Sequence, residues 1–125
     1  MCKYCIVIMS LSKNNEINLE DFRVVRSKNV YSKVFTGRDR GKFVREQSRL
    51  DEIDGQYETV KIIIPKDIRS INPSFFEEMF VNVVKRHGKD EFLRRYQFES
   101  LGDYNFEKPL AEAIERILRT NTAIG

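Results

Sequence analysis

Two cysteines near the amino terminus are the first residues whose spacing suggests chemistry. Cys2 and Cys5 form a Cys-x-x-Cys pair, which is the spacing of a redox dithiol or of half a zinc site. A zinc site needs two further ligands, yet the chain has only these two cysteines and a single histidine, His87. A redox pair of the thioredoxin type would stand between a strand and a helix inside the domain, whereas this one begins at residue 2. The pattern favours ordinary thiols, and we expect neither a metal nor a cofactor.

Three further patterns lack the geometry that catalysis or phosphate binding requires. In residues 37–43 three residues separate the glycines, where a P-loop has four, and Phe43 stands where its serine or threonine would be. His87 lies at a predicted helix end, where its expected role is to cap the last carbonyls. Glu77 and Glu78 are adjacent and therefore point to different helix faces, unlike the converging carboxylates of an acid–base pair. We therefore expect no enzymatic activity.

Ser74 stands at the start of the best-marked helix of the chain, after a hydrophobic strand and a short loop. The positive end of a helix favours a phosphate, so the Ser74 hydroxyl is a candidate phosphoacceptor. The simpler alternative is a helix cap. Asn72 or Ser74 suits that role, and Ser74 with Glu77 three residues later fits a capping box. The residues alone favour the cap.

The basic residues are concentrated in the first part of the chain. The net charge is only +3, but residues 1–50 hold 11 Lys and Arg against 5 Asp and Glu. The excess peaks around Lys33 and continues, mixed with Asp39 and Glu46, through five further cations: Arg38, Arg40, Lys42, Arg45 and Arg49. Such a stretch can contact the phosphates of a nucleic acid. A solvated helix face is the alternative, and no nucleic-acid-binding motif accompanies the charge.

Length and composition indicate one folded domain. The chain has 125 residues, 41% of them hydrophobic and 33% charged, and its 9 Phe and 5 Tyr exclude a disordered polar chain. No apolar run reaches the roughly 20 residues that a membrane span needs. Residues 5–9 are too short for the core of a signal peptide, and two cysteines suit a reducing compartment, so we expect a cytoplasmic protein. Met9 offers an alternative start, which leaves open whether residues 1–8 belong to the natural product.

Two elements dominate the hydrophobic pattern. Thr59 to Ile64 is a run rich in β-branched residues that Pro65 ends, which predicts a central strand covered on both faces. The helix that begins near Ser74 carries one broad apolar stripe and is expected to stop at Gly88. The stripe consists of Phe75, Phe76, Met79, Phe80, Val83 and Val84.

Weaker patterns predict the other elements. Short strands are expected within residues 17–25 and 30–35, a helix after the 37–41 turn through Ile53, a turn at Asp54-Gly55, a short helix over 90–96, a strand over 97–101 and a last helix over 105–119. This order predicts an α/β fold with a mixed sheet of four to five strands, helices packed mainly on one face, and an N-terminal β extension. The expected domain covers residues 34–119, between the extension at 1–33 and a tail at 120–125.

The segment from Val60 to Phe80 resembles the STAS-like family, bacterial relatives of the STAS domain of sulfate transporters and anti-sigma factor antagonists. In that family a hydrophobic strand and a short loop lead to Ser-Phe and then to an acidic residue, which here are Ser74, Phe75 and Glu78. Residues 35–38 resemble the entry to the family's first helix, and residues 88–98 resemble its next helix and strand.

Two positions depart from the family's pattern. Its strand commonly ends in Asp-Phe, where this chain has Ile64 and Pro65. Anti-sigma factor antagonists carry Asp-Ser-Ser-Gly at the helix start, with the first serine phosphorylated, whereas residues 72–75 here read Asn-Pro-Ser-Phe. Proline thus takes the place of the phosphoserine, and only the second serine remains as Ser74. The departure favours a scaffold without a phosphoswitch.

The resemblance spans residues 34–119 and implies an α/β STAS-like domain that acts as a non-enzymatic regulatory module. The implied partner is a protein, of the GHKL-type ATPase or kinase class. The implied surface is the loop at 68–74 and the exposed side of the following helix, with contacts from Arg69, Asn72, Ser74 and Glu78. The alternative function is nucleic-acid association through the basic segment at 33–49. A small-molecule sensor, which would need an apolar pocket, also stays open.

Overall fold

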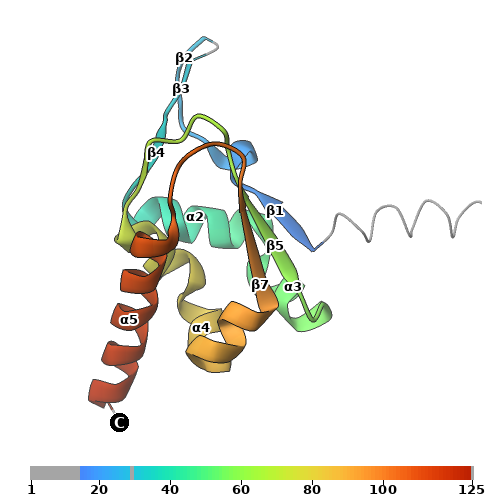
Figure 1. Ribbon diagram of the computed structural model, residues 1–125, viewed down its shortest axis with the longest axis vertical. Coiled ribbons are helices and arrows are strands. Elements are labelled where there is room, and N and C mark those ends of the chain that lie inside the picture. Colours follow the sequence, from blue (N-terminus) through green and yellow to red (C-terminus); the bar gives the residue numbers. More distant parts are fainter. Residues whose placement is uncertain (1–14, 29, 125) are drawn as a thin grey trace, which may run out of the picture.

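The computed structural model describes residues 15–28 and 30–124, and the side chains among these up to residue 119 (Figure 1). The elements follow one another as β1 (Glu16–Asn18), the 3-10 helix η1 (Leu19–Phe22), β2 (Val25–Ser27), β3 (Val30–Tyr31), β4 (Val34–Phe35), α2 (Arg38–Ser48), α3 (Leu50–Gln56), β5 (Val60–Ile64), β6 (Ser70–Ile71), α4 (Pro73–Arg95), β7 (Tyr96–Ser100) and α5 (Glu107–Ile124). This mixture of strands and helices confirms the predicted α/β class.

The main sheet has three parallel strands in the order β1–β5–β7. Ile17, Ile62 and Phe98 lie side by side across it. The hydrophobic run over 59–64 predicts a central strand, and the position of β5 between two neighbours confirms it. Parallel neighbours require crossover connections, which the helices between the strands supply.

The helices pack mainly on one face of this sheet. Along β7, Tyr96 is buried while Gln97 and Glu99 are exposed, so the side chains alternate between the core and the solvent. On the outer face the Lys61 ammonium of β5 lies 2.8 Å from the Glu99 carboxylate. The expectation that the central strand is covered on both faces therefore holds at Ile63, which is 9% exposed, but not at Lys61.

The strands that the structure describes form three small sheets rather than one mixed sheet of four to five strands. β2 and β3 form an antiparallel hairpin, while β4 and β6 form a two-stranded parallel sheet. Only two residues of β6 pair with β4, which is too short a run for the sequence pattern to reveal. The sheet prediction is wrong for this reason: the short strands pair with one another and not with the main sheet.

The predicted N-terminal extension contributes to the main core. β1 pairs with β5, and Ile17 and Leu19 are 3% and 0% exposed. The core therefore continues across the predicted boundary between residues 33 and 34.

A left-handed residue divides the helix predicted after residue 37 into α2 and α3. Arg49 has φ 59° and ψ 41°, and its N–H donates to the carbonyl oxygens of Arg45 and Glu46. This conformation ends α2 and begins α3 on a new axis. Val44 of α2 is buried, whereas its neighbour Phe43 is 42% exposed.

α4 is the central helix of the core. All six residues of its predicted apolar stripe are buried. Gly88 interrupts the helical geometry with φ 81° and ψ 172°, as its expected role as a stop requires, and residues 89–95 continue as a second helical segment. Gly41 of α2 lies against the first turns of α4, where an added Cβ would be 2.4 Å from the Phe75 carbonyl oxygen. α2 and α4 are therefore closely packed.

α5 packs on α4 and completes the core (Figure 1). It begins at Glu107, after Asn105, whose Oδ1 accepts the Glu107 N–H at 3.0 Å, and it extends beyond the predicted end at 119. Before α5, the Tyr104 hydroxyl accepts the Ile71 N–H at 2.9 Å and donates to the Ile71 carbonyl at 3.3 Å. The start of α5 is thereby tied to β6. Among the described residues, no helix has both the length and the apolar character needed to cross a membrane.

Candidate functional site

The segment from Arg69 through β6 to the first turns of α4 presents the residues that the resemblance implies for partner binding. Two backbone hydrogen bonds hold it against the chain around β4. The Arg69 N–H donates to the Lys33 carbonyl at 2.8 Å, and the Asn72 N–H donates to the Phe35 carbonyl at 2.9 Å. Ile71 is buried, while the side chains of Arg69 and Asn72 are exposed. The parallel pairing of β4 with β6 therefore holds this turn in one conformation on the surface.

Asn72 caps α4 and positions Ser74. Its Oδ1 accepts the Ser74 N–H at 3.0 Å and the Ser74 hydroxyl at 3.0 Å. Ser74 is half-buried, in the first turn of the helix. The prediction of a capping box between Ser74 and Glu77 is wrong, because Asn72 takes the cap position and Pro73 starts the helix. The Glu77 carboxylate turns instead to cations of other helices.

Glu77 and Glu78 form an ionic contact with α2, which we call the α2–α4 seam (Arg38, Arg45, Glu77 and Glu78). Arg38 lies 3.3 Å from the Glu77 carboxylate and 3.9 Å from that of Glu78. Arg45 lies 3.6 Å from the Glu78 carboxylate and also donates to the Glu78 backbone carbonyl. The seam joins a residue predicted for protein binding, Glu78, to two predicted for nucleic-acid binding.

Two of the remaining cations of the basic segment, Arg40 and Arg49, also have neighbours close by in the sequence. The Arg40 guanidinium stacks over the Phe43 ring, 4.6 Å from its centroid. Arg49 lies 3.9 Å from the Glu52 carboxylate, and both side chains are well exposed. Lys42 is exposed. The segment is therefore a helix face of mixed charge, with part of its positive charge balanced by α4.

A surface hollow of about 700 Å³ lies at the start of α2. Gly37, with φ 89°, precedes the helix, and no side chain caps it. The lining is Thr36, Gly37, Arg38, Asp39, Arg40 and Phe43. This lining has both charge signs and includes no lysine. A second, more apolar hollow of about 340 Å³ lies between the 89–93 segment and α5.

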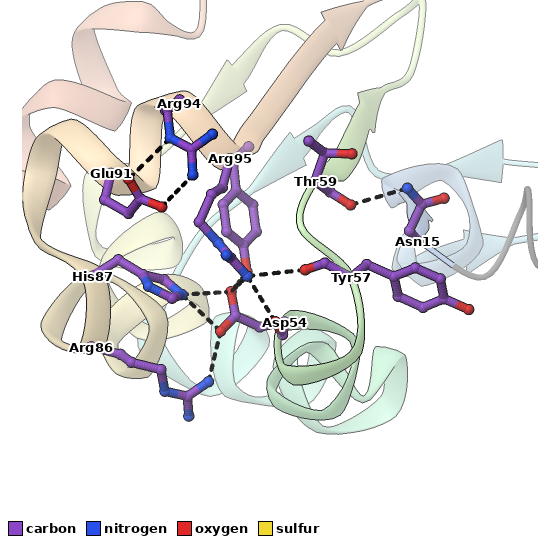
Figure 2. A network of polar contacts seen from close by, with 10 residues as sticks. Asn15, Asp54, Tyr57, Thr59, Arg86, His87, Glu91, Arg94 and Arg95 are labelled. Atoms are coloured by element: carbon purple, nitrogen blue, oxygen red, sulfur yellow. Dashed lines mark hydrogen bonds and ion pairs between the residues drawn. The ribbon is translucent and has the colours of Figure 1, made fainter.

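A buried network of polar contacts surrounds Asp54, near the end of α3 (Figure 2). Its side chain is 1% exposed. Arg86 donates to it at 2.7 Å, the Tyr96 hydroxyl donates at 2.7 Å, and His87 Nε2 lies 2.9 and 3.0 Å from its two oxygens. Arg95 lies 3.6 Å from the carboxylate and donates to the Asp54 backbone carbonyl at 2.8 Å. We call these five residues the Asp54 cluster.

The electrostatics of the Asp54 cluster indicate a structural role rather than acid–base chemistry. Burial alone would raise the pKa of Asp54, but the hydrogen bonds from Tyr96, His87 and Arg86 outweigh burial and hold this pKa below its usual value. Burial and the Asp54 carboxylate raise the pKa of the Tyr96 phenol. Asp54 is therefore ionised and Tyr96 neutral at ordinary pH. Since both carboxylate oxygens already have partners, Asp54 has little capacity to accept a substrate proton.

Sequence reasoning missed this cluster because Asp54 precedes Gly55 and so indicates a turn. A usable signal was present nevertheless. Asp54 follows the apolar Leu50 by four residues, which places the two side chains on the same face of a helix. An acidic residue on such a face needs a buried cation or donor. His87, predicted as a simple helix cap, provides part of that pairing.

The described residues contain no group of three or more His, Asp or Glu side chains that would hold a metal. Cys2 and Cys5 lie outside the described residues. No family model, no curated protein and no solved structure matches the chain.

Proposed function

We propose that this protein is a non-enzymatic regulatory module that binds a protein partner through residues 68–78, which comprise the end of the loop after β5, β6 and the first turns of α4. The observation that carries the proposal is the presentation of this segment. Its backbone is fixed by β4, its cap residue Asn72 and the cation Arg69 face the solvent, and the Ser74 hydroxyl is oriented by Asn72. A preorganised turn loses little conformational entropy when a partner binds it.

The resemblance to STAS-like proteins adds the class of partner. We propose a GHKL-type ATPase or kinase, with Arg69 and Asn72 as its main polar contacts. Glu78 is a weaker candidate for direct contact than Arg69, because its carboxylate already lies close to Arg45 and Arg38. The same ion pairs make nucleic-acid association the less favoured function, since three of the five cations proposed for it, Arg38, Arg45 and Arg49, have carboxylates beside them.

The test is affinity capture from the host's own lysate, with four forms of the full chain compared side by side. They are the wild type, Ser74→Glu, Arg69→Glu and, as a matched control, Lys85→Glu. Lys85 is exposed on α4, about three turns beyond the helix start. Glutamate in the first turn of a helix is tolerated by the helix dipole, so Ser74→Glu is expected to fold.

An ATPase that the wild type and Lys85→Glu retain, and that Ser74→Glu and Arg69→Glu release, is the expected result. Equal capture of the same proteins by all four forms would exclude residues 68–78 as the binding surface. Capture of nucleic acid, lost in high salt, would instead support the function of the basic segment.

A further inference from the structure

The hairpin of β2 and β3 projects from the body of the protein (Figure 1). Val25 pairs with Tyr31, and Ser27 pairs with Val30. Four apolar side chains of this segment are strongly exposed: Val24 at 39%, Val25 at 62%, Val30 at 49% and Tyr31 at 44%. Single exposed apolar residues are common on proteins, but four on one short hairpin form a patch of the kind that marks an interaction site.

The base of the hairpin is firmly attached. The Arg23 guanidinium lies 2.8 and 3.0 Å from the two carboxylate oxygens of Asp67, 3.0 Å from Glu20 and 3.0 Å from the Ser32 carbonyl. It also lies 5.7 Å from the centroid of the Tyr31 ring. These contacts tie the hairpin to the loop after β5. A partner would therefore meet an ordered projection.

The charge of this region has one sign. No acidic residue stands between Asp21 and Asp39 in the sequence, whereas Arg26, Lys28 and Lys33 are exposed there. The hairpin thus combines exposed apolar side chains with positive charge. Its complement is a partner that is both apolar and acidic.

The hairpin also has unpaired edges. Within residues 15–28 and 30–124, β2 and β3 pair with each other and with no other strand. The outer edge of such a ribbon is a template for a further strand. Val24 and Val25 are consecutive, so they point to opposite faces of the ribbon. A strand added at the edge of the hairpin has side chains on both faces of the ribbon and can contact apolar residues on each. A flat surface, such as a membrane, contacts only one face.

We infer that the β2–β3 hairpin binds an extended segment of a partner protein that carries both acidic and apolar residues. The exposed apolar side chains favour a protein partner over a nucleic acid, because a phosphate backbone offers no apolar surface against which a valine can be buried. Because these side chains lie on both faces of the hairpin, an added strand is favoured over a membrane surface. The inference goes beyond the proposed function, since this surface is separate from residues 68–78.

Photo-cross-linking of the full chain in its host cells tests the inference. p-Benzoylphenylalanine replaces Val30, and a control chain carries it in place of Gln97, which is exposed on the outer face of the sheet. We expect an adduct at Val30 and not at Gln97, with a cross-linked peptide that contains both acidic and apolar residues. Arg26→Glu with Lys28→Glu is expected to reduce the adduct about tenfold, through like-charge repulsion. Circular dichroism confirms that this variant folds.

Several outcomes would overturn the inference. They are an adduct with nucleic acid, lipid or a second copy of the chain, a cross-linked peptide without acidic residues, and a yield at Val30 no higher than at Gln97. Ser74→Glu separates the two surfaces. It is expected to leave the hairpin adduct unchanged, and loss of the adduct in that variant would contradict a separate surface.

Discussion

The Asp54 cluster and the α2–α4 seam use the same chemical groups in opposite ways. In the cluster one carboxylate, 1% exposed, receives donors from α4 and β7. In the seam two carboxylates, 13% and 27% exposed, share cations of α2 at 3.3 to 3.9 Å. Burial decides the difference: a charge without water depends wholly on its partners, while a charge near water does not. The cluster should therefore carry much more stability than the seam.

Removal of the buried carboxylate should have the largest effect. Asp54→Ala leaves Arg86, His87, Arg95 and Tyr96 without their common acceptor, and loss of one partner of a buried ion pair costs about 3–5 kcal/mol. Because Arg86 is 47% exposed, we expect a value near the lower end, about 3 kcal/mol. Urea unfolding gives the free energy of unfolding. Asp103→Ala, on an exposed loop, is the control and should change it little.

A loss below about 1 kcal/mol for Asp54→Ala would contradict the comparison, because the cluster would then behave like a surface pair.

Acid and alkali should weaken the same cluster from two sides. The folded pKa of Asp54 lies below its ordinary 3.8, so its contribution is complete above that pH and is lost as the pH falls through the folded value. The folded pKa of Tyr96 lies above its ordinary 10.0, so its contribution is complete below pH 10 and declines as the pH rises further. The urea midpoint, measured from pH 2.5 to 7 and from pH 9 to 11, follows the loss of stability in acid and in alkali. We call these two parts of the pH profile the acid limb and the alkaline limb.

Two variants assign these limbs. Asp54→Asn should flatten the acid limb and Tyr96→Phe the alkaline limb, each relative to the wild type. An acid limb of unchanged slope in Asp54→Asn would assign it to other carboxylates, such as Asp67 and Glu91, whose pKa values are also lowered.

The packing beneath the seam should matter more than its charges. In Gly41→Ala the new Cβ would meet the Phe75 carbonyl oxygen at 2.4 Å and the Glu78 Cβ at 3.0 Å, so α2 must move away from α4. Overpacking of this kind costs about 1–3 kcal/mol. Gly55→Ala is the matched control, because nothing lies within 4 Å of its added Cβ and alanine favours a helix. We expect the two variants to change the urea midpoint in opposite directions.

The same contrast shows what the sequence can predict. The central strand, the apolar stripe of α4 and its stop at Gly88 follow from period and residue type, because each repeats a local signal over several residues. The capping box failed because Pro73 suits the first helical position and leaves Asn72 as the cap. β6 and the Asp54 cluster depend on partners 32 to 42 residues away, and no local pattern encodes such pairings.

The cap of α4 separates structural from functional roles at the candidate site. Asn72→Ala removes the acceptor of the Ser74 N–H and should cost about 1 kcal/mol. Ser74→Ala removes only the hydroxyl bond, so the free energy of unfolding should change by less than about 0.5 kcal/mol. Thermal unfolding measures both variants. If Ser74→Ala is the more destabilising, the hydroxyl is a structural group and a weaker candidate for partner contact.

A similarly small effect should come from the ion pair of the seam. A double-mutant cycle of Arg45→Ala and Glu78→Ala isolates the contact between their side chains, while the Arg45 bond to the Glu78 backbone carbonyl survives in Glu78→Ala. We expect a coupling of about 0.2–1 kcal/mol that decreases in 1 M salt, as for other pairs near water. A salt-insensitive coupling above about 2 kcal/mol would contradict the comparison, because the seam would then stabilise the fold in the same way as the Asp54 cluster. A weak, screened coupling would instead mean that Glu78 can exchange Arg45 for another partner at little cost, as its proposed role in partner binding requires.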